Sequence, residues 1–545
     1  MGVRWAVAHS FFGVPKPYNF VNTPLKKKLL SVLVKIFVSL ILILGLAGCL
    51  TYFNKFNRYK WLTIVFTGDI NGKLFPLKIK NKKDKELLTG GISLISTAIK
   101  EIKSQCIYRN RSYLILDSGD MFNFAVYNNA EQRMVLTDFI NTIGYDAIAL
   151  GNHELDSGIQ NFISISNALN VPFVCSNIEK NFTTDTITKD FANIVCPYID
   201  KEIDSYKIGI VGFITEDLIN ILPVQYRNEI KVSSYKILNK TINNLRSGGC
   251  DLIILLSHNG FDPKYPEKSP DYKIAGIIDG IDIILSGHRE KGVSQTFQHP
   301  VTKTYICSNY GNGATITKID LYIDTIKAQI MRFNQILLNV NSDNYIQDTA
   351  FELCNDSIIH HENLEKGFFD ISIKFSKLNQ NENNTHRVIT EILRRVYSAD
   401  CSILNKGFIR GQFVEKRNYI SDIANIIPHN NYAVKFFVKG SQMYKLAELV
   451  SYNKEKLSIS GLNIIYSISP ENIYEITGLN NSQFDLNRYY KIVTSDFCYK
   501  KYFDKSDLQI KDFKQDTRTI IESFSLFLPG KEFAFYFEKN IKKLE

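Results

Sequence analysis

Short apolar runs alternate with helix-like stretches along most of the chain from about residue 61 onward. Gly90-Gly91 precedes a stretch whose apolar residues recur at helical spacing, and a second pattern of this kind covers 131–143. The apolar runs that we interpret as strands occupy 61–67, 113–116, 147–150, 171–175, 207–211, 251–256 and 281–285. Strands that alternate with helices in this way predict an α/β fold.

The length of 545 residues exceeds that of one ordinary domain, so two or three domains are expected. The pattern turns polar and helical around 339–365, which we interpret as an interdomain connection. The chain then divides into a targeting and anchoring segment over 1–55, a first α/β domain over 60–338, and a second, smaller unit over 366–545.

The first 55 residues carry the pattern of an export signal. Lys26-Lys27-Lys28 precedes an apolar run over 29–50 that is interrupted only by Lys35 and small residues. The run ends in Leu46-Ala-Gly-Cys49, which resembles a bacterial lipobox, where the cysteine is lipidated. We therefore expect an exported, membrane-anchored protein, either a lipoprotein at Cys49 or a signal anchor, with the rest of the chain outside the cytoplasm.

The formal net charge of +10 does not indicate nucleic-acid binding. Residues 1–50 hold six basic residues and no acidic one, which leaves 59 basic against 55 acidic residues in the remainder. A basic stripe of the kind that follows a phosphate backbone is not evident. The nine cysteines form no CxxC pair and no metal-finger spacing, so buried free thiols are expected, and disulfides remain an alternative outside the cell.

Five predicted strands end in residue types that bind metals, each close to a glycine. These residues are Asp69, Asp120, Asn152, His258 and His288. One such residue is usually a turn or cap residue, but five in succession have no good structural explanation. In an α/β sheet, ligands bind outside the carboxyl ends of the strands. The set predicts two divalent ions about 3.5–4 Å apart that share one carboxylate.

The motifs around these residues resemble those of the calcineurin-like metallophosphoesterases. They are Gly68-Asp-Ile-Asn-Gly72, Gly90-Gly91, Ser118-Gly-Asp120, Gly151-Asn-His-Glu-Leu-Asp156, Ser257-His-Asn-Gly260 and Gly287-His288. With the second unit, nearly everything after about residue 60 is similar to the two-domain 5′-nucleotidase family. The resemblance implies a four-layer α/β/β/α catalytic domain over 60–338 and a smaller α/β substrate domain over 366–545.

The resemblance also implies roles for the metal ligands. Asp120 resembles the bridging ligand between two ions, with Asp69 on the first ion and Asn152, His258 and His288 on the second. His153 and Asp156 resemble the catalytic dyad, in which His153 stabilises or protonates the leaving oxygen and Asp156 fixes its tautomer. An imidazole oriented by a carboxylate three residues later is a workable general acid.

Two positions depart from the family pattern, both at the first ion. Asn71 stands where histidine is usual, and Glu290 stands where histidine or glutamine is usual. If both bind, the first ion has only oxygen ligands, which favours Mn²⁺, Mg²⁺ or Ca²⁺ over Zn²⁺, although Zn²⁺ stays possible. The competing interpretation is a decayed site that holds one ion or none.

The second unit carries a partial match to the family's substrate-binding motifs. Asn405-Lys-Gly407-Phe-Ile-Arg410 resembles a phosphate-binding motif in which Arg410 grips the substrate phosphate. Phe497 could stack on a nucleobase, but the glycines that usually follow are missing, and Lys456-Leu457 stands where a second aromatic is expected. Hydrolysis of nucleoside monophosphates or related nucleotide esters is therefore predicted. The alternatives are a phosphatase or phosphodiesterase for another or a cyclic ester, and a catalytically inactive surface binding protein.

Overall fold

The structure is a computed structural model in which the chain divides into two compact units, Met1–Lys60 and Trp61–Glu545. It describes residues 24–80, 85–123, 126–127, 129–179, 185–204, 206–222, 224–366, 368–375, 385–409, 416–419, 423, 426–427, 431–466, 473–478, 482–529, 531–537 and 541–543.

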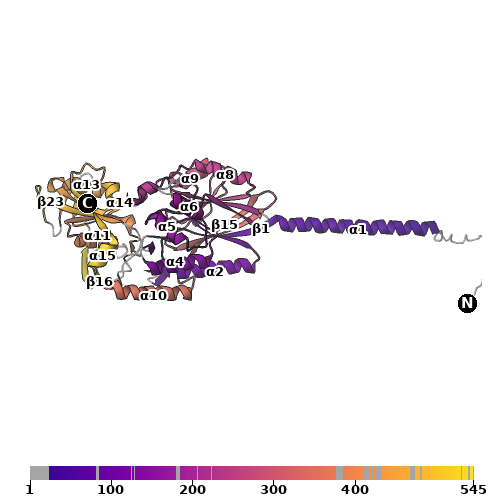
Figure 1. The fold of residues 1–545 in the computed structure, drawn as a ribbon, viewed down its shortest axis with the longest axis horizontal. Helices are drawn as coiled ribbons and strands as arrows, with labels where there is room; N and C mark the ends of the chain where they lie inside the picture. The colour runs from indigo at the N-terminus through magenta and orange to yellow at the C-terminus, as the bar shows by residue number, and fades with distance from the viewer. Residues whose placement is uncertain are drawn as a thin grey trace, which may run out of the picture. The chain divides into compact units, whose positions relative to one another are not determined.

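The first unit contains one long helix, α1 (Pro24–Arg58, 35 residues; Figure 1). Its large apolar side chains between Leu30 and Leu44 are exposed, with Leu30 and Phe37 each 65% accessible. None of the helices within the described ranges meets the combined length and hydropathy needed to cross a bilayer. The side chain of Cys49 lies outside the described residues.

Two mixed sheets form the centre of the domain that follows. The first has the order β15-β14-β1-β4-β5-β6-β7 and the second the order β12-β13-β11-β10-β9-β8. The strands of the first sheet are β1 (Tyr59–Thr67), β4 (Ser112–Asp117), β5 (Ala147–Ala149), β6 (Phe173–Val174), β7 (Val195–Cys196), β14 (Thr315–Asp324) and β15 (Gln329–Asn339). Those of the second are β8 (Tyr198–Ile203), β9 (Tyr206–Ile214), β10 (Leu252–His258), β11 (Ile283–Ser286), β12 (Phe297–Gln298) and β13 (Tyr305–Ser308).

Alternation along the strands explains why the two sheets pack face to face. In β1, Ile64 and Phe66 face the second sheet, whereas Val65 faces the outer helices. Gly212 on β9 permits this close approach, because a Cβ atom there would lie 2.0 Å from the Val174 carbonyl oxygen on β6. The sheets therefore share one inner layer of apolar side chains.

Helices cover the outer face of each sheet (Figure 1). The helices on the first sheet are α2 (Ile92–Tyr108), α4 (Ala130–Ile143), α5 (Ile159–Ser166), α6 (Asp185–Ile194) and α10 (Thr349–Lys366). Those on the second are α8 (Ile237–Ser247) and α9 (Pro270–Ile277), while α7 (Leu218–Ile221) lies near the first group. The predicted four-layer α/β/β/α arrangement is confirmed.

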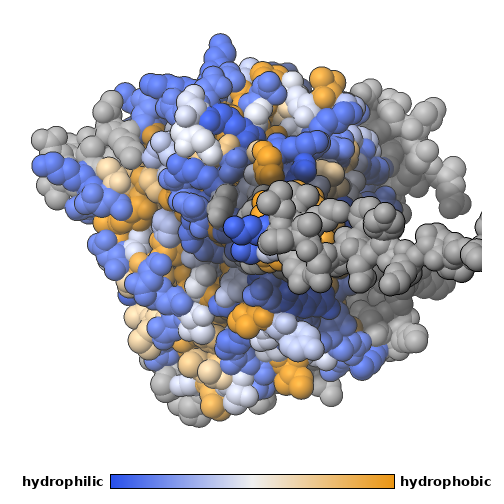
Figure 2. Space-filling view, turned by 90° about the vertical axis from the view of Figure 1, so that its right-hand side faces the viewer, coloured by the Kyte–Doolittle hydropathy of each residue, from blue (hydrophilic) through white to orange (hydrophobic). Residues whose placement is uncertain are grey.

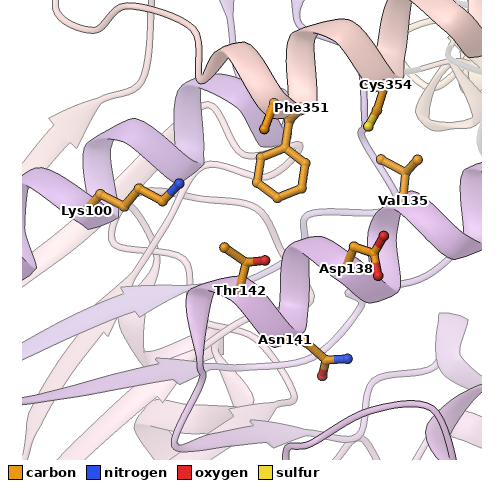
Figure 3. A pocket seen from close by; sticks show the side chains of 8 residues that line it. Lys100, Val135, Asp138, Asn141, Thr142, Phe351 and Cys354 are labelled. Atoms are coloured by element: carbon orange, nitrogen blue, oxygen red, sulfur yellow. The ribbon is translucent and has the colours of Figure 1, made fainter.

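Helix α10 lies almost entirely within the segment that the sequence predicts as an interdomain connection, yet its first half packs on α2 and α4. Phe351 contacts Phe139 with ring centroids 5.6 Å apart, and the Asn355 amide donates to the Leu74 carbonyl. Where the three helices meet, Lys100, Asp138 and Phe351 help to line a surface pocket of about 450 Å³ (Figure 3). The connection is thus anchored to the first domain over half of its helix.

A second α/β region follows, built on a five-stranded sheet of order β20-β17-β23-β19-β24. Its strands are β17 (Cys401–Asn405), β19 (Tyr432–Lys439), β20 (Leu457–Ser460), β23 (Tyr489–Ser495) and β24 (Ile510–Thr519). The helices are α11 (Thr385–Val396), α13 (Met443–Tyr452), α14 (Asp496–Tyr502) and α15 (Ile520–Phe527). One smaller sheet contains β16 (Phe368–Phe375), β18 (Lys416–Tyr419) and β25 (Glu532–Phe537), and another contains β21 (Asn463–Tyr466), β22 (Ile473–Thr477) and β26 (Ile541–Lys543). The hairpin of β2 (Leu77–Lys80) and β3 (Glu86–Thr89) belongs to the first domain.

The surface carries mixed hydropathy on the face drawn in Figure 2. Hydrophilic residues there are interspersed with small groups of hydrophobic ones. Scattered apolar residues are normal on a soluble domain and need no partner to explain them.

Candidate metal centre

The strands that carry the predicted ligands end at the same edges of the two sheets. Parallel register pairs Thr67 on β1 with Asp117 on β4, and Asp117 with Ile148 on β5. In the second sheet, Ser257 on β10 pairs with Ser286 on β11. Turns that follow these positions therefore emerge side by side, which brings residues far apart in the sequence into one site.

The turns hold several predicted ligands in the left-handed region of backbone conformation. The φ angles are 53° at Asp69, 54° at Asn71, 56° at Asp120, 72° at His288 and 52° at Glu290. Non-glycine residues rarely adopt this conformation, and they concentrate at functional sites where the surrounding structure enforces it. The backbone thus marks the same residues that the sequence motifs indicate.

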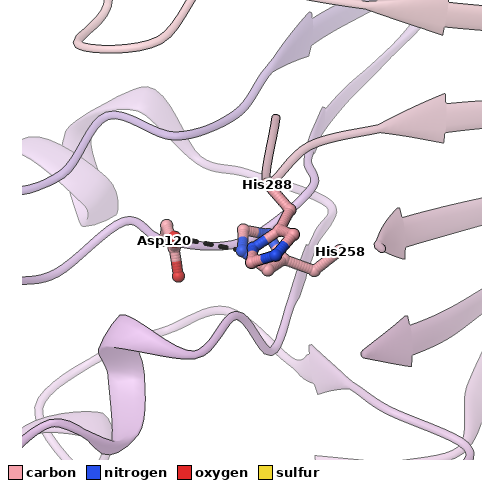
Figure 4. Close-up of side chains that lie close together, drawn as sticks. All are labelled: Asp120, His258 and His288. Atoms are coloured by element: carbon pink, nitrogen blue, oxygen red, sulfur yellow. Dashed lines mark ion pairs between the residues drawn. The ribbon is translucent and has the colours of Figure 1, made fainter. Parts of the chain in front are cut away.

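Asp120, His258 and His288 form the centre of the site (Figure 4). Their potential ligand atoms all lie within 4.8 Å of one another, and His258 Nε2 is 3.0 Å from Asp120 Oδ2. Asp120 and His258 are buried. This combination of one carboxylate and two imidazoles is a recurring ligand set for divalent transition metals.

Asn152 joins this centre and shows that the donor set fits a cation. Its Oδ1 lies 3.2 Å from His258 Nε2 and 3.0 Å from His288 Nδ1. His258 Nδ1 lies 2.8 Å from the Ser118 carbonyl oxygen, which needs a proton on that nitrogen. In the neutral form of the ring, the lone pair of Nε2 then points at the oxygens of Asn152 and Asp120. Lone pairs that converge in this way are satisfied by a metal ion, and the Nδ1–H···O=C bond is the usual support for a histidine ligand.

The pKa shifts of the buried groups indicate that the site favours a positive charge. Burial lowers the pKa of His258, but the Asp120 carboxylate outweighs it, so the pKa rises to about 10. Burial raises the pKa of Asp69, and its neighbours Asp120 and Glu290 raise it further, against the opposing effect of His258. The carboxylates thus favour a proton on His258, and a divalent cation would take the place of that proton and relieve their repulsion.

Hydrogen bonds connect the residues predicted for a first ion to one another and to the backbone of His288. The side-chain Nδ2 of Asn71 donates to Glu290 Oε1 at 3.3 Å and to the Asp69 backbone carbonyl at 3.0 Å. The His288 amide nitrogen lies 2.9 Å and 3.0 Å from the two Asp69 carboxylate oxygens. Asn71 and Glu290, the two positions that depart from the family pattern, therefore contact each other, and both are predicted ligands of the same ion.

His153 and Asp156 are close enough to act as a pair. His153 Nδ1 lies 2.7 Å from Asp156 Oδ2, and His153 Nε2 lies 3.9 Å from Asp120 Oδ2. Burial lowers the pKa of His153, but Asp156 and Asp120 outweigh it, so the pKa rises to about 10. The imidazole can therefore hold a proton at neutral pH beside the candidate metal centre.

Glu154, within the same motif, has a role that sequence reasoning missed. Its carboxylate accepts from the backbone N–H groups of Gly151 at 2.7 Å, Asp120 at 2.9 Å and Phe122 at 3.0 Å. A Cβ atom at Gly151 would lie 2.3 Å from the Asp120 nitrogen, so only glycine allows these two turns to touch. The fully buried Glu154 side chain thus joins the turn that carries Asp120 to the turn that carries Asn152.

The predicted substrate residues are only partly described. Asn405 ends β17 and its buried Oδ1 accepts no hydrogen bond from the described residues, whereas Arg410 lies outside the described residues. Phe497 is 37% exposed at the start of α14, and Lys501 Nζ lies 5.2 Å from its ring centroid. A lysine from the segment where the family usually carries glycine therefore occupies the approach to one face of this ring.

Comparison with known proteins assigns both regions. Residues 62–289 match the calcineurin-like phosphoesterases, and residues 361–504 match the 5′-nucleotidase C-terminal domain. The chain belongs to the 5′-nucleotidase family. The snake venom 5′-nucleotidase of Crotalus adamanteus is 24% identical over 484 residues, which cover 77% of this chain and 76% of that relative. As a member of this family, the protein is a metal-dependent phosphoric-ester hydrolase.

Solved structures share the fold of this 5′-nucleotidase family member. A 5′-nucleotidase precursor from Thermus thermophilus has a TM-score of 0.70 at 18% identity, covering 89% of this chain and 99% of its own. The sulfate thiohydrolase of Thermus thermophilus has a TM-score of 0.63 at 16% identity, covering 89% and 96%. Likeness at this level of identity establishes the fold, and the substrate has to be argued from the site.

Proposed function

We propose that the protein hydrolyses nucleoside monophosphates, or related nucleotide esters, to nucleoside and phosphate with the help of two divalent ions. The observation that carries the proposal is the convergence of Asp120, Asn152, His258 and His288 on one point, with the His153–Asp156 pair beside Asp120. The relatives named 5′-nucleotidase support a nucleotide as the substrate.

Asp120 would be shared by both ions. Asn152, His258 and His288 would complete one ligand set, and Asp69, Asn71 and Glu290 the other. When bound, such ions polarise phosphoryl oxygens and lower the pKa of water. The ligand set of the first ion, which comprises Asp69, Asn71, Asp120 and Glu290, contains only oxygen atoms, which favours Mn²⁺, Mg²⁺ or Ca²⁺ over Zn²⁺.

The chain's own catalytic group is His153. Its Nδ1 faces Asp156, which fixes the tautomer and leaves Nε2 to hold a proton on the side of Asp120. From there it can protonate the oxygen of the departing nucleoside, as a general acid does. Asp156 stabilises the charged ring and keeps it in this orientation.

The test is phosphate release by the full-length chain in mild detergent. The substrates would be AMP, UMP, a cyclic nucleotide and an aryl phosphate, each with Mn²⁺, Mg²⁺, Ca²⁺, Zn²⁺ or chelator. Metal-dependent release that favours a nucleotide is expected. If no phosphate is released with any of the metals, the proposal is refuted and an inactive binding protein is favoured.

A second candidate function is hydrolysis of a different phosphoester, and one observation favours it. Lys501 lies over the ring of Phe497, and Lys456 and Leu457 stand where a second aromatic is usual, so the stacking surface for a base is reduced. Phosphate release from the aryl phosphate alone would favour this alternative, and so would opening of the cyclic nucleotide to a nucleoside monophosphate, detected by chromatography, without phosphate release from AMP or UMP.

We also propose that the protein is exported and held at a membrane through its N-terminal segment. The lysine triplet at 26–28 and the exposed apolar side chains between Leu30 and Leu44 support this location. Whether anchoring uses lipid on Cys49 or the helix itself would be decided by metabolic labelling with fatty acid. Recovery of the full-length chain in the soluble cytoplasmic fraction would contradict the proposal.

A further inference from the structure

Two serines lie at or next to the ends of the strands that lead to the histidines of the candidate metal centre. Ser257 on β10 and Ser286 on β11 are register partners. Both side chains lie on the outer face of the sheet, because Leu255 and Ile284, two residues earlier, belong to the apolar layer under α8 and α9. Hydroxyl groups in this layer need hydrogen-bond partners, because an unsatisfied polar group is costly to bury.

Asp271 supplies the partner for both serines. Ser257 Oγ donates to Asp271 Oδ1 at 2.6 Å, and Ser286 Oγ donates to Asp271 Oδ2. Asp271 lies in the first turn of α9, and its amide nitrogen donates to the Gly260 carbonyl at 3.3 Å. The carboxylate therefore joins two strand ends, and the backbone N–H of the same residue joins the turn that follows His258.

The position of this carboxylate is unusual for a packing residue. Asp271 is completely buried, and Ile274 and Ala275 of the same helix belong to the apolar layer. Burial raises the pKa of Asp271, and the hydrogen bonds from the two serines only partly oppose this effect. An apolar residue would fill the same space without this cost, so the carboxylate contributes something other than volume.

What it contributes follows from the neighbours of the two serines. Ser257 directly precedes His258, and Ser286 lies two residues before His288. The Gly287 amide nitrogen donates to the Ser257 carbonyl at 2.8 Å, which links the two strand ends a second time. Through the two serines, Asp271 therefore joins the strand ends that carry both imidazoles, from the outer face of the sheet.

We propose that Asp271 is a positioning residue that holds His258 and His288 at the separation needed to bind one divalent ion. The inference rests on the proposed metal site and adds a residue that touches neither ion nor substrate. Supporting residues of this kind typically change metal affinity by about 10- to 100-fold when they are removed.

Calorimetric titration of the full-length chain with Mn²⁺ would test the role. In Asp271→Ala we expect one binding step to weaken by about 10- to 100-fold while the other stays within about twofold. The d–d absorption of added Co²⁺ should shift as well, because it reports ligand geometry rather than stability. Asp271→Asn should recover part of the affinity, since its amide keeps one acceptor and a serine hydroxyl can turn to accept from the other end.

A matched control is available at the opposite end of the same two strands. Asp282, just before β11, accepts from the Ile253 amide nitrogen on β10 at 2.7 Å and from Arg246 at 2.6 Å. Asp282→Asn should lower stability without changing either Mn²⁺ step. If it weakens Mn²⁺ binding as much as Asp271→Ala does, the positioning role is refuted.

The outcomes separate this inference from the function on which it rests. If the natural chain binds neither Mn²⁺ nor any of the other divalent ions of the phosphate-release assay, the proposed function fails and this role fails with it. If the natural chain binds Mn²⁺ and the Asp271 variants bind it equally well, only the positioning role fails. If Asp271→Ala does not fold, Ser257→Ala combined with Ser286→Ala decides in its place, because it removes both contacts and leaves the carboxylate.

Discussion

Replacing Glu154 by glutamine is the sharpest single test of how the candidate metal centre is built. The natural carboxylate offers Oε2 to Gly151 and Asp120 and Oε1 to Phe122. Glutamine has almost the same shape but replaces one acceptor oxygen by an NH₂ group. Whichever way the amide turns, at least one backbone N–H then faces a donor instead of an acceptor.

The magnitude follows from the number of bonds lost. The better orientation keeps Oε2 in place and loses the bond from Phe122, whereas the other loses two bonds. A buried donor left without its partner costs about 1–3 kcal/mol. The free energy of unfolding should therefore fall by about 2 kcal/mol, which corresponds to about 4–8 °C in melting temperature for a domain of roughly this size. Mn²⁺ affinity should fall too, because the turn that carries Asp120 is no longer held to the turn that carries Asn152.

The assay combines thermal unfolding with Mn²⁺ titration of the full-length chain. Asp146→Asn is the matched control, since Asp146 accepts from the Ile115 amide nitrogen at 2.8 Å and lies before β5, away from the ligand-bearing ends of the strands. The control should lose stability but keep its Mn²⁺ affinity. A Glu154→Gln protein with unchanged stability and unchanged affinity would show that these three hydrogen bonds do not support the site.

Two further perturbations test the catalytic pair and the second domain. His153→Ala should lower kcat for AMP by about 10²- to 10⁴-fold, while the amount of bound metal, measured by elemental analysis, stays the same. The loss should be smaller for an aryl phosphate, because its leaving group needs no proton. An equal loss for both substrates would argue against proton donation. Glu391→Gln should lower the melting temperature at pH 7, because Arg394 and Arg395 lie 2.7 Å and 2.6 Å from the carboxylate. Although burial raises the pKa of Glu391, hydrogen bonds from Arg394, Ser460 and Arg395 outweigh it, so the folded value lies below the unfolded one. The stability that this carboxylate contributes is present above the unfolded pKa and is lost as pH falls through the folded pKa, so the two melting curves should converge in acid, and a constant difference would contradict the linkage.

The sequence predicts the central strands of the fold well because each is a short apolar run that ends in a polar turn. It predicts the edge strands poorly: β15 is largely exposed, and its residues do not form a continuous apolar run. The predicted metal residues come together since parallel strands place their ends along common edges. Asp271 and Glu154 were not predicted as site residues, because one buried carboxylate that accepts from serines or backbone N–H groups has no distinctive spacing in sequence.

The hydrogen bonds between the turns explain how the fold maintains a strained ligand set. Five predicted ligand residues have left-handed backbone conformation, and each such residue costs about 1 kcal/mol or more. Their turns are linked to one another: the Asn71 amide nitrogen donates to the Asp120 carbonyl at 2.7 Å, and the Asp69 amide nitrogen donates to the Gly119 carbonyl at 2.9 Å. The His288 amide nitrogen completes the link through the Asp69 carboxylate. Because these contacts join protein groups to protein groups, the positions of the ligands follow from the fold itself.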